Sequence, residues 1–261
     1  MQDNLYRFER ILNFRDCGGH RTIQGYRMNT GMIYRCGSLE YASKDDLKRL
    51  QSLGLKTICD LRTKMEIKSK PDRLPDATVN YVNVPVTPKD SDYFDSTKRL
   101  IALLTGKFRN VDFNELIKTQ YGDFVLSQAE QFARVLTLLC DRENYPLIIH
   151  CTGGKDRTGF ACALIQATVG VPMETVISDY LLSNSSTKQL EVRLKRSILI
   201  MSLFGIKKDQ LKPLTGVKRE FLEIAFKKIE TEFGSLESYL SEGLLLRSSV
   251  SPDLKALLLR E

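Results

Sequence analysis

Apolar residues gather in short runs near the N-terminus and again in the middle of the chain. Residues 56–61, 81–84 and 146–150 are such runs, each bounded by turn-forming or polar residues, so we predict three strands. A short helix over 44–53 precedes the first strand and ends at a glycine. The segment 85–96 contains two prolines and three aspartates, which is typical of a loop.

Further along the chain, apolar residues recur every three or four positions, which is the spacing of one helix face. The first stripe consists of Val125, Ala129, Phe132, Leu136 and Leu139. Another helix is predicted over 158–169. A further stripe consists of Leu222, Ala225, Phe226, Ile229 and Phe233. Strands that alternate with helices, followed by helices alone, predict one α/β domain over residues 1–261 with a helical supplement at 173–261.

The chain is basic, with 39 lysines and arginines against 32 acidic residues and a net charge of +7. Residues 186–230 contain 11 lysines and arginines but 5 acidic residues, so most of the excess lies there. Such a surface could attract an anionic substrate or an anionic membrane surface, although a solvated helical face explains the same charges. No zinc-finger spacing or RNA-binding aromatic motif occurs, so we expect no nucleic-acid partner.

The cysteines and histidines indicate neither a zinc site nor a disulfide framework. The cysteines are Cys17, Cys36, Cys59, Cys140, Cys151 and Cys162. None forms a C-x-x-C pair, and the two histidines are far apart, so we expect buried thiols apart from Cys151. Residues 1–7 lack the apolar core of a secretory signal, so we expect a cytoplasmic protein, with signal-independent export as the alternative.

The most informative segment runs from Ile149 to Gly159 and reads I-H-C-T-G-G-K-D-R-T-G. It leaves a predicted buried strand, passes Gly153 and Gly154, and enters a predicted helix. This arrangement points several backbone N–H groups inward and forms an anion nest at a helix N-terminus. Cys151 lies at the mouth of that nest, where the N–H groups favour the thiolate, so it is placed to attack phosphorus in line.

Three further residues of this segment complete the predicted chemistry. Arg157 has a planar guanidinium that can hold two phosphate oxygens and stabilise charge in the transition state. The leaving oxygen needs a proton, and we predict Asp156 as the acid that supplies it. The alternatives are three aspartates of the polar loop: Asp90, Asp92 and Asp95. Lys155 would add positive charge at the rim of the pocket.

The remaining residues of the segment have supporting roles in this prediction. Thr152 belongs to the phosphate-binding loop, and Thr158 could donate a hydrogen bond to the sulfur of Cys151. His150 is expected to buttress the loop rather than to act as an acid. A nucleotide-binding loop is excluded, because an aspartate follows the Gly-Lys pair and an isoleucine replaces the first glycine of that motif.

The run from His150 to Gly159 resembles the H-C-x-x-G-K-D-R-x-G loop of the atypical, bacterial-type protein-tyrosine-phosphatase family. Other segments that resemble this family are residues 13–19, 34–38, 60–62 with Glu66, 179–184 and 233–239. Together they cover most of the chain in the family's order. The resemblance implies a protein-tyrosine-phosphatase-like α/β fold, with a central, mostly parallel sheet flanked by helices and extra C-terminal helices.

The same resemblance implies a function and a set of residues. Members of the family need no metal or cofactor, and act on phosphotyrosine, on phosphoserine or phosphothreonine, and often on phosphoinositides. The resemblance favours the loop aspartate, Asp156, as the acid and places Arg15 and Asp16 near the pocket. Some relatives carry a helical lid, for which residues 112–121 or 186–204 would be candidates.

The sequence therefore predicts a phosphatase that works through a phosphocysteine on Cys151, with a phosphoprotein or a phosphoinositide as substrate. Two alternatives follow from the same residues. One is a non-catalytic module of the same fold that binds phosphate without turnover. The other is an enzyme that acts on soluble inositol polyphosphates, which competition with phosphotyrosine peptides would reveal.

Overall fold

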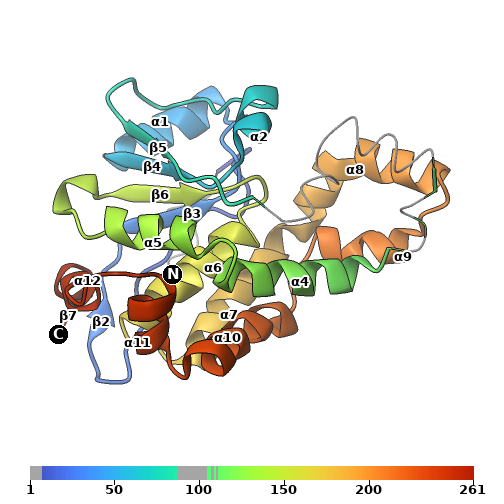
Figure 1. Ribbon diagram of the computed structural model, residues 1–261. Helices are drawn as coiled ribbons and strands as arrows, with labels where there is room; N and C mark the ends of the chain where they lie inside the picture. Colours follow the sequence, from blue (N-terminus) through green and yellow to red (C-terminus); the bar gives the residue numbers. More distant parts are fainter. Residues whose placement is uncertain (1–7, 88–104, 107–108, 110) are drawn as a thin grey trace.

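The central element of the fold is a five-stranded sheet, seen in a computed structural model that describes residues 8–87, 105–106, 109 and 111–261 (Figure 1). In sheet order the strands are β1 (Arg15–Asp16), β3 (Ile33–Cys36), β6 (Leu147–His150), β4 (Thr57–Asp60) and β5 (Asn80–Asn83). Strands β3, β6, β4 and β5 run parallel, and the short β1 pairs antiparallel with β3. The predicted α/β fold with a mostly parallel sheet is therefore confirmed.

Helices cover both faces of this sheet. They are α1 (Lys44–Ser52), α2 (Lys64–Ser69), α4 (Phe113–Val125), α5 (Ala129–Leu138), α6 (Arg157–Thr168), α7 (Met173–Leu181), α8 (Thr187–Leu203), α9 (Lys208–Leu211), α10 (Arg219–Phe233), α11 (Leu236–Ser238) and α12 (Val250–Leu258). In β6, Leu147 and Ile149 point into the main core with α5 and α6. Ile148 points to the other face, into a second cluster with Leu50 of α1. This alternation buries the strand on both faces, as its continuous apolar sequence predicted.

The predicted strands agree with β4, β5 and β6 to within one residue at either end. The predicted helices over 44–53 and 158–169 correspond to α1 and α6. One of the predicted helices differs in the structure. The stripe that begins at Val125 does not belong to a single helix, because α4 ends there and α5 starts at Ala129. The amide of Gln128 bonds to the carbonyl of Asp123, and the chain then re-enters a helix with the later stripe residues still facing the core.

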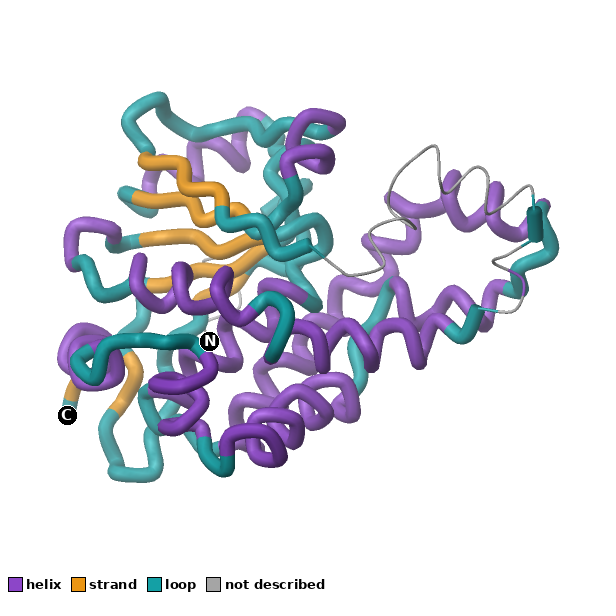
Figure 2. Tube along the Cα trace, viewed as in Figure 1, coloured by secondary structure: helices purple, strands orange, loops and turns teal. Residues whose placement is uncertain are grey.

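The C-terminal half is largely helical. The main cluster of buried side chains draws on both halves of the chain, from Cys17 to Leu258. A two-stranded antiparallel sheet pairs β2 (Arg27–Met28) with β7 (Leu259–Arg260), so the C-terminal end of the chain lies beside its N-terminal part. Helices α8 and α9 project from the sheet-containing body (Figures 1 and 2). They share a small core of their own with Phe113, Ile206 and Leu211. No helix within the described ranges is long and apolar enough to cross a membrane.

Candidate active site

The loop of residues 151–156 leaves the carboxyl end of β6 and enters α6 at Arg157. Neighbouring segments hold the carbonyl groups of this loop. The amide of Ser38 donates to the carbonyl of Thr152 at 3.1 Å. Asn13 Nδ2 and Arg35 Nη2 donate to the carbonyl of Gly154 at 2.7 Å and 3.0 Å. These bonds fix the loop from its outer side.

The amide groups of the loop, unlike its carbonyls, are not bound by neighbouring segments of the described chain. Within the part of the chain that the structure describes, the backbone N–H groups of residues 152–156 have no hydrogen-bond acceptor. They lie directly before the N-terminus of α6, where the helix dipole adds positive potential. Cys151 is at the start of the same loop and is 3% exposed. The loop thus offers an anion cradle with a thiol at its base.

The two glycines of the loop have different roles. Gly154 has a φ of +67°, and a Cβ there would lie 2.4 Å from the backbone carbon of Cys36. Gly153 has no such constraint, since its Cβ would make ordinary contacts of 3.6 Å with Lys155 and 3.7 Å with Leu190. The close approach of the loop to the end of β3 therefore requires a glycine at position 154 but not at position 153.

Arg157 is held by Glu66 of α2 in a two-bond ion pair. Its Nη1 and Nη2 donate to Oε2 and Oε1 of Glu66, each at 2.8 Å. Burial alone would raise the pKa of the Glu66 carboxyl, but the charge of Arg157 and hydrogen bonds from Arg157, Thr152 and Thr63 lower this pKa to about 2. The planar guanidinium is thereby held beside the loop, where Nη2 also lies 3.4 Å from the hydroxyl oxygen of Thr152.

We expect Glu66→Gln to lower kcat/KM for an aryl phosphate by about tenfold, because an amide cannot accept two charge-assisted bonds from Arg157. Steady-state rates for wild type and variant measure this effect. Met65→Gln is the control, since Met65 neighbours Glu66 on α2 and is exposed. Equal rates for Glu66→Gln and wild type would show that the ion pair does not orient Arg157 for catalysis.

The same ion pair has a defined pH dependence. Because the folded-state pKa of Glu66 is lowered from 4.5 to about 2, its contribution to stability is complete above pH 4.5 and is lost as the pH falls towards 2. The difference in unfolding free energy between wild type and Glu66→Gln should therefore shrink over that acidic range. Denaturant titrations at several pH values would measure it.

Asp156 is placed between two side chains that bind its carboxylate. Tyr121 of α4 donates its hydroxyl to Oδ1 at 3.2 Å, and Lys155 Nζ lies 2.7 Å from Oδ2. Lys155 itself is buried and also donates to the carbonyl of Gly216 at 3.2 Å. The three alternative acids in the polar loop, Asp90, Asp92 and Asp95, lie outside the described residues.

Thr152 of the loop and Thr158 of α6 differ in their contacts. Thr152 donates to Oε1 of Glu66 at 2.6 Å and so belongs to the Arg157 network. Thr158 was predicted to donate to the sulfur of Cys151. Its hydroxyl is buried without a hydrogen-bond partner among the described residues, so the structure does not contain that bond.

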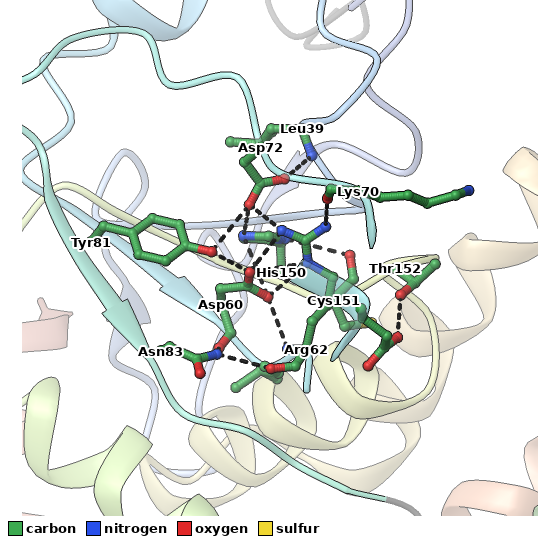
Figure 3. A network of polar contacts seen from close by, with 12 residues as sticks. Leu39, Asp60, Arg62, Lys70, Asp72, Tyr81, Asn83, His150, Cys151 and Thr152 are labelled. Atoms are coloured by element: carbon green, nitrogen blue, oxygen red, sulfur yellow. Dashed lines mark hydrogen bonds and ion pairs between the residues drawn. The ribbon is translucent and has the colours of Figure 1, made fainter. Parts of the chain in front are cut away.

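His150 is fully buried behind the loop, in the polar network of Figure 3. Its Nε2 lies 3.2 Å from Oδ2 of Asp72 but is not aligned for a hydrogen bond. Arg62 donates to Asp60 at 2.8 Å and to Asp72 at 2.5 Å. Asp60, Asp72 and His150 have the spacing of a metal site, but the Arg62 guanidinium already supplies the cation between the two carboxylates.

Arg15 and Asp16, near the start of the described chain, both bind other protein groups. Arg15 donates to Oδ1 of Asp179 at 3.1 Å and to Asn13, and it thereby supports the loop indirectly. Asp16 accepts from the amides of Gly18 and Gly31 and shapes the turn after β1. Arg15 thus contacts Asn13, which holds the loop, and a role of Arg15 and Asp16 in substrate binding stays a prediction.

Several residues around the site had no predicted role. Asn13 and Arg35 hold the Gly154 carbonyl, Glu66 holds Arg157, and Tyr121 contacts Asp156. Each lies on a separate segment of the chain. The signal that could have identified three of them was their presence in segments that resemble the phosphatase family, but Tyr121 lies in none of those segments.

The chain is similar in sequence to known phosphatases. The chain is 31% identical over 237 residues, 91% of its length and 83% of the relative's, to a protein of Cupriavidus necator whose name assigns it provisionally to the tyrosine-protein phosphatases. It is 31% identical over 270 residues to the triple specificity protein phosphatase PtpB of Mycobacterium tuberculosis, covering 92% of this chain and 94% of PtpB. A solved structure of Pseudomonas aeruginosa TpbA is 16% identical, with a TM-score of 0.35 over 77% of this chain and 89% of TpbA. The sequence pattern of a tyrosine phosphatase family matches residues 6–260, and the chain belongs to that family.

Proposed function

We propose that this protein hydrolyses phosphate monoesters through a phosphocysteine intermediate on Cys151. The observation that carries the proposal is the loop itself. Cys151 lies at the base of a cradle whose carbonyls are bound from outside, whose amides face no acceptor within the described chain, and whose rim holds the oriented guanidinium of Arg157. This is the arrangement that a transferring phosphoryl group requires.

The reaction has two steps. The Cys151 thiolate attacks phosphorus, the bond from phosphorus to the ester oxygen breaks, and Asp156 gives its proton to the leaving oxygen. Water then attacks the phosphocysteine, which releases inorganic phosphate and restores the thiolate, while Asp156 takes a proton from the water. In both steps the loop amides and Arg157 bind the equatorial oxygens.

For the substrate we propose phosphorylated proteins together with phosphoinositides. The name of the M. tuberculosis relative, a triple specificity phosphatase, supports a broad substrate range. Lys155 supports an additional phosphate, because its buried ammonium lies at the edge of the loop beside Asp156. Soluble inositol polyphosphates are the second candidate, and the same lysine favours them.

The test is phosphate release from a phosphotyrosine peptide, a phosphoserine peptide, a phosphoinositide in vesicles and an inositol polyphosphate, each with reductant and chelator. We expect turnover of the tyrosine peptide and the phosphoinositide. Turnover of the inositol polyphosphate alone would replace the proposed substrate class. Phosphate binding with no turnover of any substrate would replace the enzyme with a binding module.

Contact with an anionic membrane surface belongs to the same proposal. Helix α8 begins beside the active-site loop, where Leu190 adjoins Gly153. Its exposed face mixes cationic and apolar side chains. These are Lys188, Val192, Lys195, Arg196, Leu199 and Leu203. Basic and apolar side chains on one helix face favour binding to anionic lipid headgroups.

We expect Lys195→Glu/Arg196→Glu to lower hydrolysis of a phosphoinositide in anionic vesicles by about tenfold, since each cation near such a surface contributes about 1 kcal/mol. Rates on a soluble phosphotyrosine peptide should change less than about twofold. Lys48→Glu/Lys227→Glu is the matched control, because both lysines are exposed on other helices. An equal loss with both double variants would assign the effect to net charge instead of to α8.

A further inference from the structure

Two buried tyrosines form a short hydrogen-bonded chain that ends on Asp156. Tyr121 of α4 and Tyr180 of α7 are both fully buried. Their hydroxyl oxygens are 2.6 Å apart, and the Tyr121 hydroxyl lies 3.2 Å from Oδ1 of Asp156. Two helices distant in sequence thus meet at one oxygen of the predicted acid.

The direction of this chain follows from the groups it contains. Burial, followed by the charges of neighbouring groups, raises the pKa of Tyr121 and of Tyr180 well above the ordinary value, so both hydroxyls keep their protons. An unprotonated oxygen of a carboxyl group can only accept. Tyr121 therefore donates to Asp156, and Tyr180 donates to Tyr121.

Both rings are fixed by packing. A Cβ on Gly159 would lie 2.9 Å from Cε2 of Tyr180, so the ring of Tyr180 rests directly on the first turn of α6. The ring centre of Tyr121 is 5.2 Å from that of Phe124 and 5.9 Å from that of Phe221. The hydroxyl that meets Asp156 consequently has a defined position. The same packing explains why the loop motif ends in a glycine.

Asp156 has few other constraints. It occupies the N-cap position of α6, yet its side chain makes no capping hydrogen bond to the helix amides. Its orientation is therefore set by the contacts of its two oxygens, with Tyr121 at Oδ1 and Lys155 at Oδ2. An aspartate that caps its own helix would turn its carboxyl towards the backbone and away from a leaving group.

We propose that Tyr121, held by Tyr180, is a positioning residue that orients Asp156 for proton transfer to the leaving oxygen. The inference rests on the proposed function, and it assigns a role in that reaction to two residues outside the loop. Tyr121 does not contact the reacting atoms. Its hydrogen bond fixes Oδ1, so that the carboxyl group can present its proton in one direction.

The test compares two aryl phosphates, one with a poor phenol leaving group and one with a strongly acidic phenol that needs no protonation. Tyr121→Phe should lower kcat about tenfold on the first substrate and less than about twofold on the second. Tyr180→Phe should act in the same direction with a smaller effect. Tyr239→Phe is the matched control, since it removes another fully buried hydroxyl, which donates to the carbonyl of Val125.

A double-mutant cycle with Asp156→Asn completes the experiment. If Tyr121 acts through Asp156, the double variant should be no slower than Asp156→Asn alone. The inference would be overturned if Tyr121→Phe slowed turnover of both aryl phosphates by the same factor. It would also be overturned if the rate losses of Tyr121→Phe and Asp156→Asn multiplied in the double variant. If the wild-type protein turned over neither substrate, the phosphatase function itself would be refuted. Failure of the proposed function is therefore distinguishable from failure of the positioning role of Tyr121.

Discussion

Cys151→Ser is expected to abolish phosphate release, with a loss on the order of 10⁴-fold or more in kcat. A serine hydroxyl remains protonated at neutral pH and is a far weaker nucleophile than the thiolate that the proposed reaction uses. The proposed phosphate-binding groups are the amides of 152–156 and the guanidinium of Arg157, and the substitution leaves both unchanged. Inorganic phosphate should therefore bind wild type and variant with affinities within about threefold of each other.

Cys140→Ser controls for the loss of a thiol as such. Cys140 is half-buried and its Sγ donates to the carbonyl of Leu136, four residues earlier. Calorimetry with phosphate and steady-state rates with an aryl phosphate measure the two properties separately. Turnover by Cys151→Ser at more than about one hundredth of the wild-type rate would remove Cys151 from the mechanism.

Gly154→Ala should destabilise the fold by about 3 kcal/mol or more and remove activity in the folded fraction. A Cβ at this position would lie 2.4 Å from the carbonyl carbon and oxygen of Cys36 and 2.5 Å from the amide nitrogen of Gly37, and backbone atoms cannot yield as a flexible side chain can. The left-handed φ of +67° adds strain for any residue with a Cβ. Any relief would move the Gly154 carbonyl off Asn13 and Arg35.

Gly153→Ala is the matched control, because it adds the same methyl group one position earlier. Its Cβ would meet no atom closer than 3.6 Å. Thermal unfolding should show a fall of roughly 6 °C or more for Gly154→Ala and a change of less than about 2 °C for Gly153→Ala. Similar unfolding temperatures for the two variants would contradict the packing described for the loop.

The parts of the fold that could be predicted are those formed by residues consecutive in the sequence. The loop of 151–156 could be predicted because its strand, glycines and helix are consecutive, and β4, β5 and β6 because each is one apolar run. Strand β3 was not predicted, since the buried Arg35 interrupts its apolar pattern. That arginine is tolerated in the interior because Asp179 lies 3.3 Å away and the Gly154 carbonyl 3.0 Å away.

The groups that position the loop could not be found by spacing. Glu66 is 91 positions from Arg157, and Asn13 is 141 positions from Gly154. Only the parallel order β3-β6-β4 brings the ends of these segments together. Arg15 and Asp16 were placed near the pocket only by the resemblance, and their binding to substrate stays a prediction. Their side chains serve the turn after β1 and the support of Asn13.

The most direct test of the mechanism is to trap the covalent intermediate. Wild-type protein mixed with a phosphotyrosine peptide carrying labelled phosphate is denatured within milliseconds in neutral detergent, digested, and analysed by mass spectrometry. We predict labelled phosphate on the peptide that contains Cys151, and none on that peptide from Cys151→Ser. Labelled phosphate on another residue, or rapid phosphate release with no label on Cys151, would contradict a phosphocysteine mechanism.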